Sequence, residues 1–260
     1  MGKYWKWALI SLLVSAGAGF SSYNLRNVDW SALDYQKMLR PITYNPTKIE
    51  LGIDDTVVLS SEARMRRKVR AAAVEISTAM GTRGSGTYFK IDDRHLIVTA
   101  THVVSGSPVV SIIGRNGEQV FGTPVMEAEH VDMTFILIPA MNSRTPMNYK
   151  PLGYQDIDKY VGEEVTYTGF PSHHDLLTID GAIASHEEGN LIMHSYAWPG
   201  SSGAGVFDFD GNFVGVVRAV DLGVWDYRLH PTIIEDIVWV APAWGISKRE
   251  IKDLLKQRGK

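Results

Sequence analysis

Short runs of apolar or alternating residues, each closed by Gly, Asn, Asp or Pro, follow one another along most of this 260-residue chain. They begin at Ala72 and include "GSGTYFKI", "HLIVTA", "VVSIIG", "TFILIPA", "EEVTYTGF", "NLIMHSY" and "IVWVAPA". Runs of this length, with turn signals about every 8–12 residues, predict an all-β sandwich or barrel rather than alternating strands and helices. In "DFDGNF", an Asp-Gly pair between apolar residues predicts a β-hairpin.

The end of the chain departs from this pattern and predicts a closing helix. Ser247 and, three residues later, Glu250 form a capping box, the signature of a helix N-terminus. Ile251, Leu254 and Leu255 then recur on one helical face. A helix is also expected in the stretch from Ser60 to Arg70, just before the β-rich part.

The first 20 residues have the order of an export signal. Lys3 and Lys6 precede an apolar run, residues 7–20, and Ala16 and Ala18 have the small-x-small spacing of a cleavage site. Three interpretations are open: a cleaved signal peptide, a retained membrane anchor, or a buried helix. The first two predict a protein that is exported, periplasmic or secreted, or anchored through residues 7–20. Because the chain has no cysteine, its fold must be held by its core alone.

Residues 21–70 have no sustained hydrophobic period and predict a linker or pro-segment. Its basic cluster "RMRRKVR" is read either as a solvated charged face or as a dibasic processing site. The formal net charge of −3 gives no long-range attraction to a polyanion, so no nucleic-acid partner is expected.

Three segments of the β-rich part carry reactive side chains: "VTATHVV" with His102, "HVDMTFILI" with Asp132, and "GSSGAG" with two serines. Acyl transfer by serine needs an imidazole that takes the hydroxyl proton and an acid that holds this imidazole in the right tautomer. The order His, Asp, Ser is one known arrangement of these groups. Each residue alone also fits a plainer role, as a surface histidine, a strand-capping aspartate or a turn.

Together these segments resemble the chymotrypsin-like serine proteases, and among them the compact HtrA-like type, over about residues 72–257. The resemblance also rests on "GSGTYF", on "GFP", and on "VAPAWGISKREIKDLL" at the end. It implies a trypsin-like serine protease domain over residues 71–258. The expected fold is all-β, a chymotrypsin-like double β-barrel with a C-terminal helix, preceded by the N-terminal apolar segment. His102 would be the general base and Asp132 the acid that orients it.

The family pattern Gly-x-Ser-Gly identifies Ser202 as the nucleophile, and the N–H groups of Gly200 and Ser202 as the oxyanion hole. Position 201 is Ser, where digestive members of the family carry an Asp that pairs with a newly cut N-terminus. That activation salt bridge is absent here, so other contacts must order the oxyanion turn. Removal of residues 1–70 need not switch activity on.

Substrate-binding residues follow from the same resemblance. Tyr196 is expected near the base of the specificity pocket, and Val217, Arg218 and Val220 on an edge strand that pairs with the substrate backbone. Tyr196 and Val220 predict a shallow pocket for small or medium aliphatic residues. Alternatively, these two side chains only fill the core, and Arg218 is either a surface residue or a contact for an acidic substrate group.

Two functional classes are therefore open: a serine endopeptidase acting on proteins or peptides, and an inactive protease-fold module that only binds a peptide. The intact set of His102, Asp132, Ser202 and Gly200 favours the enzyme. An esterase would use the same chemistry. No cofactor and no metal are expected, since His173 and His174 point to opposite faces of an extended chain and no cysteine completes a zinc set. No PDZ-like domain is expected after the closing helix.

Overall fold

The computed structural model of the protein describes residues 60–154, 157–223 and 232–258. The predictions of a signal peptide or membrane anchor at 1–20, and of a linker over residues 21–59, lie outside these residues. No helix within the described ranges is long and apolar enough to cross a membrane.

The first β-barrel is built from six antiparallel strands. They are β1 (Ala73–Ser77), β2 (Arg83–Ile91), β3 (Arg94–Thr99), β4 (Val110–Ile113), β5 (Gln119–Ala128) and β6 (Met133–Ile138). Neighbours pair in the order β1-β4-β5-β6-β3-β2, and β1 also pairs with β2, which closes the ring. The short strand β7 (Met147–Asn148) adds to β2 in parallel.

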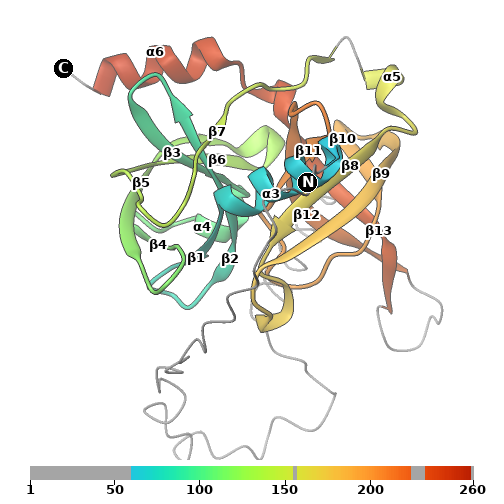
Figure 1. Ribbon diagram of the computed structural model, residues 1–260, viewed down its shortest axis with the longest axis horizontal. Coiled ribbons are helices and arrows are strands. Elements are labelled where there is room, and N and C mark those ends of the chain that lie inside the picture. Colours follow the sequence, from blue (N-terminus) through green and yellow to red (C-terminus); the bar gives the residue numbers. More distant parts are fainter. Residues whose placement is uncertain (1–59, 155–156, 224–231, 259–260) are drawn as a thin grey trace, which may run out of the picture. The chain divides into compact units, whose positions relative to one another are not determined.

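The second barrel is also closed, in the order β10-β13-β12-β11-β8-β9. Its strands are β8 (Glu164–Gly169), β9 (Leu177–Glu187), β10 (Asn190–His194), β11 (Gly205–Asp208), β12 (Phe213–Gly223) and β13 (Thr232–Pro242). The hairpin predicted at "DFDGNF" is confirmed, because β11 and β12 pair through Phe207 and Phe213. The two barrels lie side by side (Figure 1), so the expected double β-barrel is confirmed.

An aromatic cluster holds the two barrels together. Phe89 of β2 packs against Tyr149, Phe207 and Phe213, with ring centroids 5.0–5.9 Å apart. Phe207 and Phe213 belong to the second barrel, and all four rings are almost fully buried. Such edge-to-face and tilted pairs add specific geometry to the burial of large apolar areas. The cluster therefore fixes the barrels relative to each other, which any site made from both of them requires.

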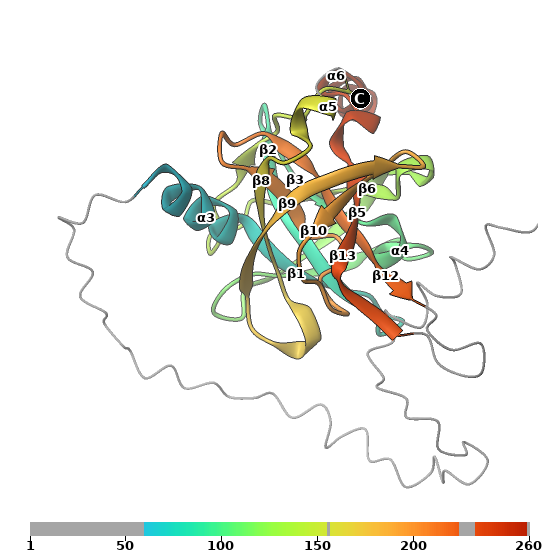
Figure 2. The ribbon, with the colours of Figure 1, turned by 90° about the vertical axis from the view of Figure 1, so that its right-hand side faces the viewer.

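Helix α3 (Ser61–Ala72) confirms the helix expected in this part of the chain. The Ser60 hydroxyl accepts a hydrogen bond from the N–H of Ala63 at 3.2 Å and so caps the helix N-terminus. Met65 and Val69 are buried in the core. In Figure 2 the helix lies beside β8 and β9. The described fold thus begins before residue 71, the domain boundary expected from the sequence.

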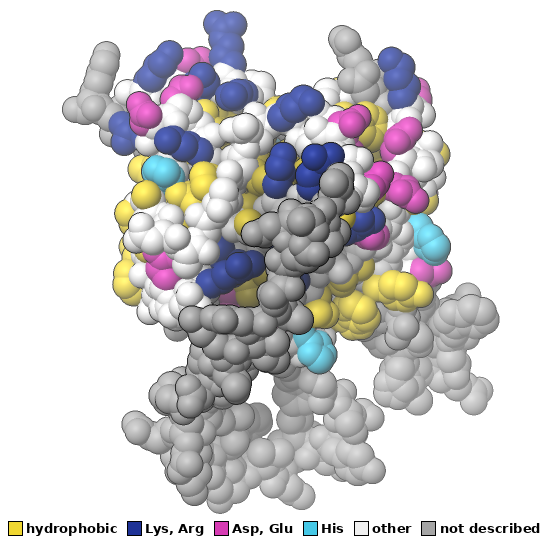
Figure 3. Space-filling view, viewed as in Figure 1, with side chains coloured by type: hydrophobic (Ala, Val, Ile, Leu, Met, Phe, Trp, Pro, Cys, Tyr) yellow, Lys and Arg dark blue, Asp and Glu magenta, His cyan; other side chains and the backbone are white. Residues whose placement is uncertain are grey.

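The basic cluster of α3 is mainly a solvated face. Arg64, Arg67 and Lys68 are exposed, and Figure 3 shows Lys and Arg side chains gathered over this helix. Arg66 and Arg70 instead tie the helix to the second barrel, because Arg66 pairs with Asp180 at 2.9 Å and Arg70 donates to the carbonyl oxygen of Leu176 at 2.7 Å.

The remaining helical elements are short, except for the last. They are α4 (Thr101–Val104), η3 (Glu129–Val131), α5 (Ile157–Tyr160), η5 (Pro171–His173), η6 (Ala243–Gly245) and α6 (Lys248–Arg258). Helix α6 is the predicted closing helix, and it buries Ile251 and Leu255. Its capping box is confirmed: the Ser247 N–H donates to the Glu250 carboxylate at 2.7 Å, and the Glu250 N–H donates to the Ser247 hydroxyl at 3.2 Å.

Replacing Ser247 by Ala is expected to destabilise the fold by about 1 kcal/mol, because the N–H of Glu250 loses its acceptor. For a domain of this size, that lowers the melting temperature by about 2–4 °C.

Hydrogen bonds from the backbone and side chain of Ser247 lower the pKa of Glu250 below its usual 4.5. The reciprocal contact thus stabilises the fold above pH 4.5 and is lost as the pH falls through the lowered value. Thermal melts from pH 7 to pH 3 test this, with exposed Lys248→Ala as the control, and an equal Tm of variant and wild type at pH 7 would contradict it.

Candidate active site

His102 and Asp132 lie at adjoining ends of two paired strands of the first barrel. His102 is in α4, the single turn that follows β3, and Asp132 is the residue before β6. Strands β3 and β6 are antiparallel neighbours with Thr99 opposite Thr134, so the end of one lies beside the start of the other. The hydroxyl of Thr134 donates to that of Thr101 at 3.0 Å, which adds a buried link between the two ends.

The Asp132 carboxylate holds both the ring and the backbone of His102. Its Oδ2 lies 2.9 Å from Nδ1 of His102, and its Oδ1 accepts the N–H of His102 at 3.1 Å. Asp132 is only 8% exposed, and its φ of +50° is a left-handed conformation that Asp tolerates better than most residues. A carboxylate at Nδ1 makes this nitrogen the donor and leaves Nε2 free to accept a proton. The pair therefore makes the contact that a general base and its orienting acid require, and its catalytic role stays a prediction.

Ser202 lies in the loop before β11, and the first barrel holds this loop in place. The N–H of Ser85, in β2, donates to the carbonyl oxygen of Ser202 at 2.8 Å. A Cβ at Gly203 would come within 2.1 Å of the Thr99 hydroxyl and 2.9 Å of the Ala100 nitrogen, so only glycine fits against the end of β3. Ser202, which is partly exposed, is thus held against the segment that leads directly into His102.

The side chains of Ser202 and His102 are not joined by a hydrogen bond in this structure. Among the described residues, no hydrogen bond joins the Ser202 hydroxyl to the imidazole or to any other group. Catalytic hydrogen bonds are often long in ligand-free enzymes and tighten only when the substrate is bound. The geometry therefore provides an oriented base next to the serine loop, with the third contact of a triad not formed.

The residues before Ser202 form a tight turn. The N–H of Ser201 donates to the Trp198 carbonyl at 2.9 Å, with Pro199 second and Gly200 third at φ +97°, as in a type II turn. The Pro199 carbonyl accepts the N–H of Ser172 at 2.6 Å. Because C=O and N–H of a trans peptide point in opposite directions, the N–H of Gly200 points away from Ser172. Within the described ranges, no group accepts the N–H of Gly200 or of Ser202.

The Ser85 hydroxyl, whose role the sequence did not suggest, fixes this turn from the first barrel. It donates to the Gly200 carbonyl at 2.6 Å and accepts the N–H of Phe170 at 2.9 Å, and Ser85 is fully buried. A Cβ at Gly200 would lie 2.4 Å from the Phe170 carbonyl oxygen, so a side chain there would push the two segments apart. The signal in the sequence was the "GSG" of "GSGTYF", whose serine faces the turn between two glycines.

Ser201 also orders the turn from within. The sequence predicts such contacts, because the chain has no Asp at position 201 to form the activation salt bridge. Ser201 is 1% exposed, and its hydroxyl accepts the N–H of Trp198 at 3.3 Å. Burial raises the pKa of Tyr167 to about 12, so its hydroxyl remains a donor at neutral pH, and it donates to the Tyr196 carbonyl just before the turn. These contacts, together with those of Ser85 and Ser172, hold the turn in place.

The expected substrate-binding residues differ in their surroundings. Val217 and Val220 are buried in the core of the second barrel. Tyr196 is 53% exposed and stacks on Trp198, so the alternative that Tyr196 fills the core is wrong. A ring this exposed also cannot form the floor of a closed pocket, and at most it borders an open one. Arg218 reaches Asp132, with 3.4 Å between Nε and Oδ2.

Strand β12 has a free side where substrate pairing was expected. Its residues up to Val216 pair with β11, whereas Ala219 to Gly223 pair with β13, and Arg218 lies at a bulge between the two registers. In the part of the chain that the structure describes, no strand lies on the other side of this segment. An extended peptide could therefore add to it by β-augmentation.

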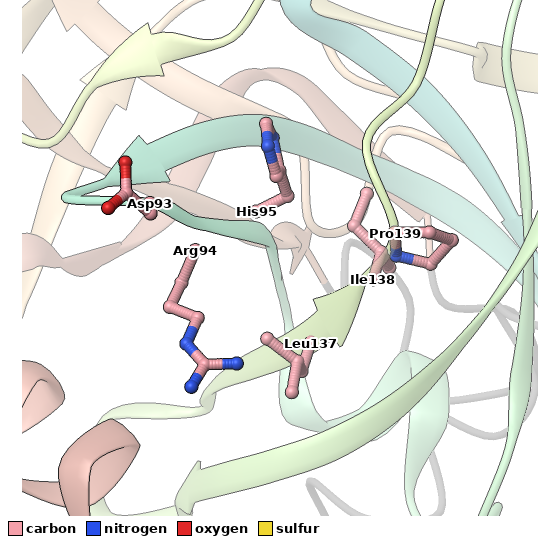
Figure 4. A pocket seen from close by; sticks show the side chains of 6 residues that line it. All are labelled: Asp93, Arg94, His95, Leu137, Ile138 and Pro139. Atoms are coloured by element: carbon pink, nitrogen blue, oxygen red, sulfur yellow. The ribbon is translucent and has the colours of Figure 1, made fainter. Parts of the chain in front are cut away.

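One surface hollow lies away from these residues, while another is lined in part by Tyr196. The first hollow contains no residue of the proposed site. It is lined by the start of β3 and the end of β6, with Arg94, His95, Leu137 and Ile138 among its residues (Figure 4). His102 and Asp132 lie at the opposite ends of the same two strands. No group of three or more His, Asp or Glu side chains within the described residues is arranged to hold a metal ion.

Comparisons with known proteins agree with this geometry. The family model described as a trypsin-like peptidase domain matches residues 84–216, just over half of the chain, and this range contains His102, Asp132 and Ser202. A comparison with curated proteins gives no match.

Two solved structures are similar in fold. The serine endoprotease from Yersinia pestis is 20% identical in sequence, with a TM-score of 0.58, over 78% of this chain and 69% of that one. The inactive form of a mutant of Rv3671c from M. tuberculosis is 17% identical, with a TM-score of 0.51, over 78% of this chain and 96% of that one. At these identities the likeness supports the fold.

Proposed function

Because the chain belongs to the trypsin-like peptidase family, we propose that it is a serine endopeptidase that hydrolyses peptide bonds through an acyl-enzyme on Ser202. The observation that carries this proposal is the partly buried Asp132–His102 pair, with 2.9 Å between Oδ2 and Nδ1, beside the loop that presents Ser202. The substrates would be proteins or peptides, as for other peptidases of this fold.

In the first half of the reaction, Nε2 of His102 takes the proton of the Ser202 hydroxyl while Oγ attacks the carbonyl carbon of the scissile bond. Asp132 stabilises the imidazolium that forms. The carbonyl oxygen becomes an oxyanion, which the free N–H groups of Gly200 and Ser202 are suited to bind. When the tetrahedral intermediate collapses, the C–N bond breaks and His102 gives its proton to the leaving amine.

In the second half, a water molecule loses a proton to His102 and attacks the acyl carbon. Collapse of the second intermediate breaks the ester bond, returns the proton to the Ser202 oxygen and releases the carboxylic acid product. The same groups thus act twice, and no cofactor is needed for either half.

A peptide-binding module without activity is the second candidate. The observation in its favour is that the Ser202 hydroxyl has no hydrogen bond to His102 among the described residues. Two measurements on the full chain separate the candidates: labelling by a fluorophosphonate, which requires an activated serine, and cleavage of an unfolded protein substrate. Labelling and cleavage support the endopeptidase, whereas peptide binding without either supports the module. Labelling with hydrolysis of esters but not of peptides would indicate an esterase.

Replacing Ser85 by Ala is expected to lower kcat about tenfold to hundredfold. This is less than the 10²–10³-fold typical of losing an oxyanion donor itself, because Ser85 only holds the Gly200 peptide. The measurement is kcat on a peptide substrate. Ser111→Ala, which removes a strand hydroxyl bonded to Gln119, is the matched control. A Ser85→Ala variant with the kcat of the wild type would contradict the role given to Ser85.

Substrate preference is proposed from the residues that border the site. The resemblance to the family and the open edge of β12 favour a small or medium aliphatic residue next to the scissile bond, although Val220 itself is buried in the core of the second barrel. Cleavage of a peptide library that varies this residue tests the preference. Cleavage after acidic or basic residues alone would contradict it.

Export or membrane anchoring through residues 7–20 is proposed from the sequence. A linker or pro-segment over residues 21–70 and a protease domain over residues 71–258 are proposed in the same way. N-terminal sequencing of the mature protein tests the first of these proposals. A start at Gly19 supports a signal peptide cleaved after Ala18, and an intact N-terminus in the membrane fraction supports an anchor.

A further inference from the structure

Arg218 reaches from the second barrel to the acidic residue of the first. It lies on β12 directly after Val217, and its Nε is 3.4 Å from Oδ2 of Asp132. This is the same oxygen that lies 2.9 Å from Nδ1 of His102. The guanidinium therefore faces the carboxylate that orients the proposed general base, although the sequence suggested only a surface or substrate-contacting role for it.

A second contact fixes the guanidinium. Its Nη1 donates to Oδ1 of Asn190 at 2.8 Å. Asn190 is itself buried, and its amide nitrogen donates to the carbonyl of Glu188 at 3.3 Å, which turns its oxygen toward Arg218. Because the guanidinium is planar and its donors are rigidly arranged, two contacts at different nitrogens define its position. Asn190 and Arg218 thus form a clamp on Asp132.

The clamp has a clear effect on the carboxylate. The N–H of His102 holds Oδ1 of Asp132, while Oδ2 is held by the imidazole and the guanidinium together. Without the cation, rotation of the carboxylate would be opposed on the Oδ2 side only by the imidazole that it has to orient.

We propose that Arg218, clamped by Asn190, is a positioning residue that holds the Asp132 carboxylate in line with His102, rather than a substrate contact. The inference rests on the proposed peptidase function. It assigns a role to Arg218 that depends on Asn190, a residue of β10 which touches neither His102 nor Ser202 in the described contacts.

The test uses the full chain and a small fluorophosphonate, whose reaction with Ser202 needs no substrate side chain. Arg218→Met, which keeps most of the aliphatic stem, is expected to lower the labelling rate and kcat about tenfold, with KM unchanged, a barrier change of about 1.4 kcal/mol. In Arg218→Lys the labelling rate and kcat should fall less, since lysine keeps the positive charge and loses only the contact with Asn190. Asn190→Ala should also lower the labelling rate and kcat. When it is combined with Arg218→Met, the double variant should have the same rates as Arg218→Met alone.

Arg66→Met is the matched control, because it removes another arginine paired with an aspartate, at the surface of α3. It should be labelled at the rate of the wild type. Thermal melting of each variant checks that it is folded.

A readout without activity completes the test. In the wild type, the proton shared by His102 and Asp132 should give a downfield NMR signal, and Arg218→Met should broaden or shift this signal while Arg66→Met leaves it unchanged. If the wild type is not labelled at all, the proposed function fails, and the NMR signal still decides the role of Arg218.

Three outcomes would overturn the inference. They are a wild-type labelling rate together with an unchanged NMR signal in Arg218→Met, a rise of KM with kcat unchanged, which indicates a substrate contact, and additive effects of the Asn190 and Arg218 substitutions.

Discussion

Replacing Ser202 by Ala is expected to lower kcat by roughly 10⁶-fold, the scale of loss when the nucleophile of a serine peptidase is removed. The methyl group of alanine cannot form the ester that divides the reaction into two halves. The backbone should change little, because Ser202 is held through its carbonyl oxygen, which accepts the N–H of Ser85 at 2.8 Å. Labelling by the fluorophosphonate should disappear while the melting temperature stays within about 1–2 °C of the wild type.

Ser201→Ala is the control next in the chain. Ser201 is 1% exposed and its hydroxyl accepts the Trp198 N–H within the turn, so its loss loosens the turn and leaves the nucleophile in place. This variant should still be labelled, at a reduced rate. Labelling that survives in Ser202→Ala and disappears in Ser201→Ala would reverse the assignment of the nucleophile.

The all-β class could be predicted because its signals are local in the sequence, whereas the double barrel was expected from the resemblance to the protease family. Strand length, turn residues and the Asp-Gly hairpin each depend on a few neighbouring residues, and so does the capping box of Ser247 and Glu250. The roles of His102 and Asp132 were expected from the same resemblance; Asp132 directly precedes β6, and His102 lies in the single turn that follows β3. Strand pairing then brought those two ends together.

Contacts between distant segments could not be predicted in this way. Ser85 acts on Gly200, 115 positions away, and Arg218 acts on Asp132 across the barrel interface. A buried serine and an arginine on a strand have the same local pattern whether or not they make such contacts. The pairing is decided by how the barrels pack, which the aromatic cluster around Phe89 controls.

Tyr196 shows the limit of transferring a position from a family pattern. The resemblance to the family gave its place along the chain, a few residues before the turn, but not the direction of its ring. Its carbonyl accepts the Tyr167 hydroxyl and its ring stacks on Trp198 at the surface. The backbone of Tyr196 thus contacts the interior of the fold while its side chain lies at the surface. The sequence alone does not show which way the side chain points.

Replacing Asp132 by Asn is expected to lower kcat by roughly 10⁴-fold, the loss seen when the same change is made in a related triad. Asn has the same shape and also tolerates the left-handed conformation at φ +50°. Two N–H donors of His102, the backbone and Nδ1, contact the carboxylate, and Nε of Arg218 forms an ion pair with it at 3.4 Å from Oδ2. An amide has one oxygen, so in either orientation its NH₂ group faces a donor, and no negative charge remains to stabilise the imidazolium.

When the amide oxygen faces the His102 backbone, the amide NH₂ faces Nδ1–H of the imidazole, and two donors oppose each other. The imidazole avoids this contact by moving its proton from Nδ1 to Nε2. A protonated Nε2 cannot take the Ser202 proton. Single-turnover acylation should therefore slow together with kcat, while peptide binding stays near the wild-type level. Asp180→Asn, which removes the carboxylate paired with Arg66, is the matched control and should keep full activity. If Asp132→Asn kept more than about a tenth of the wild-type kcat, His102 would be oriented by other groups, and the carboxylate would have no part in the chemistry.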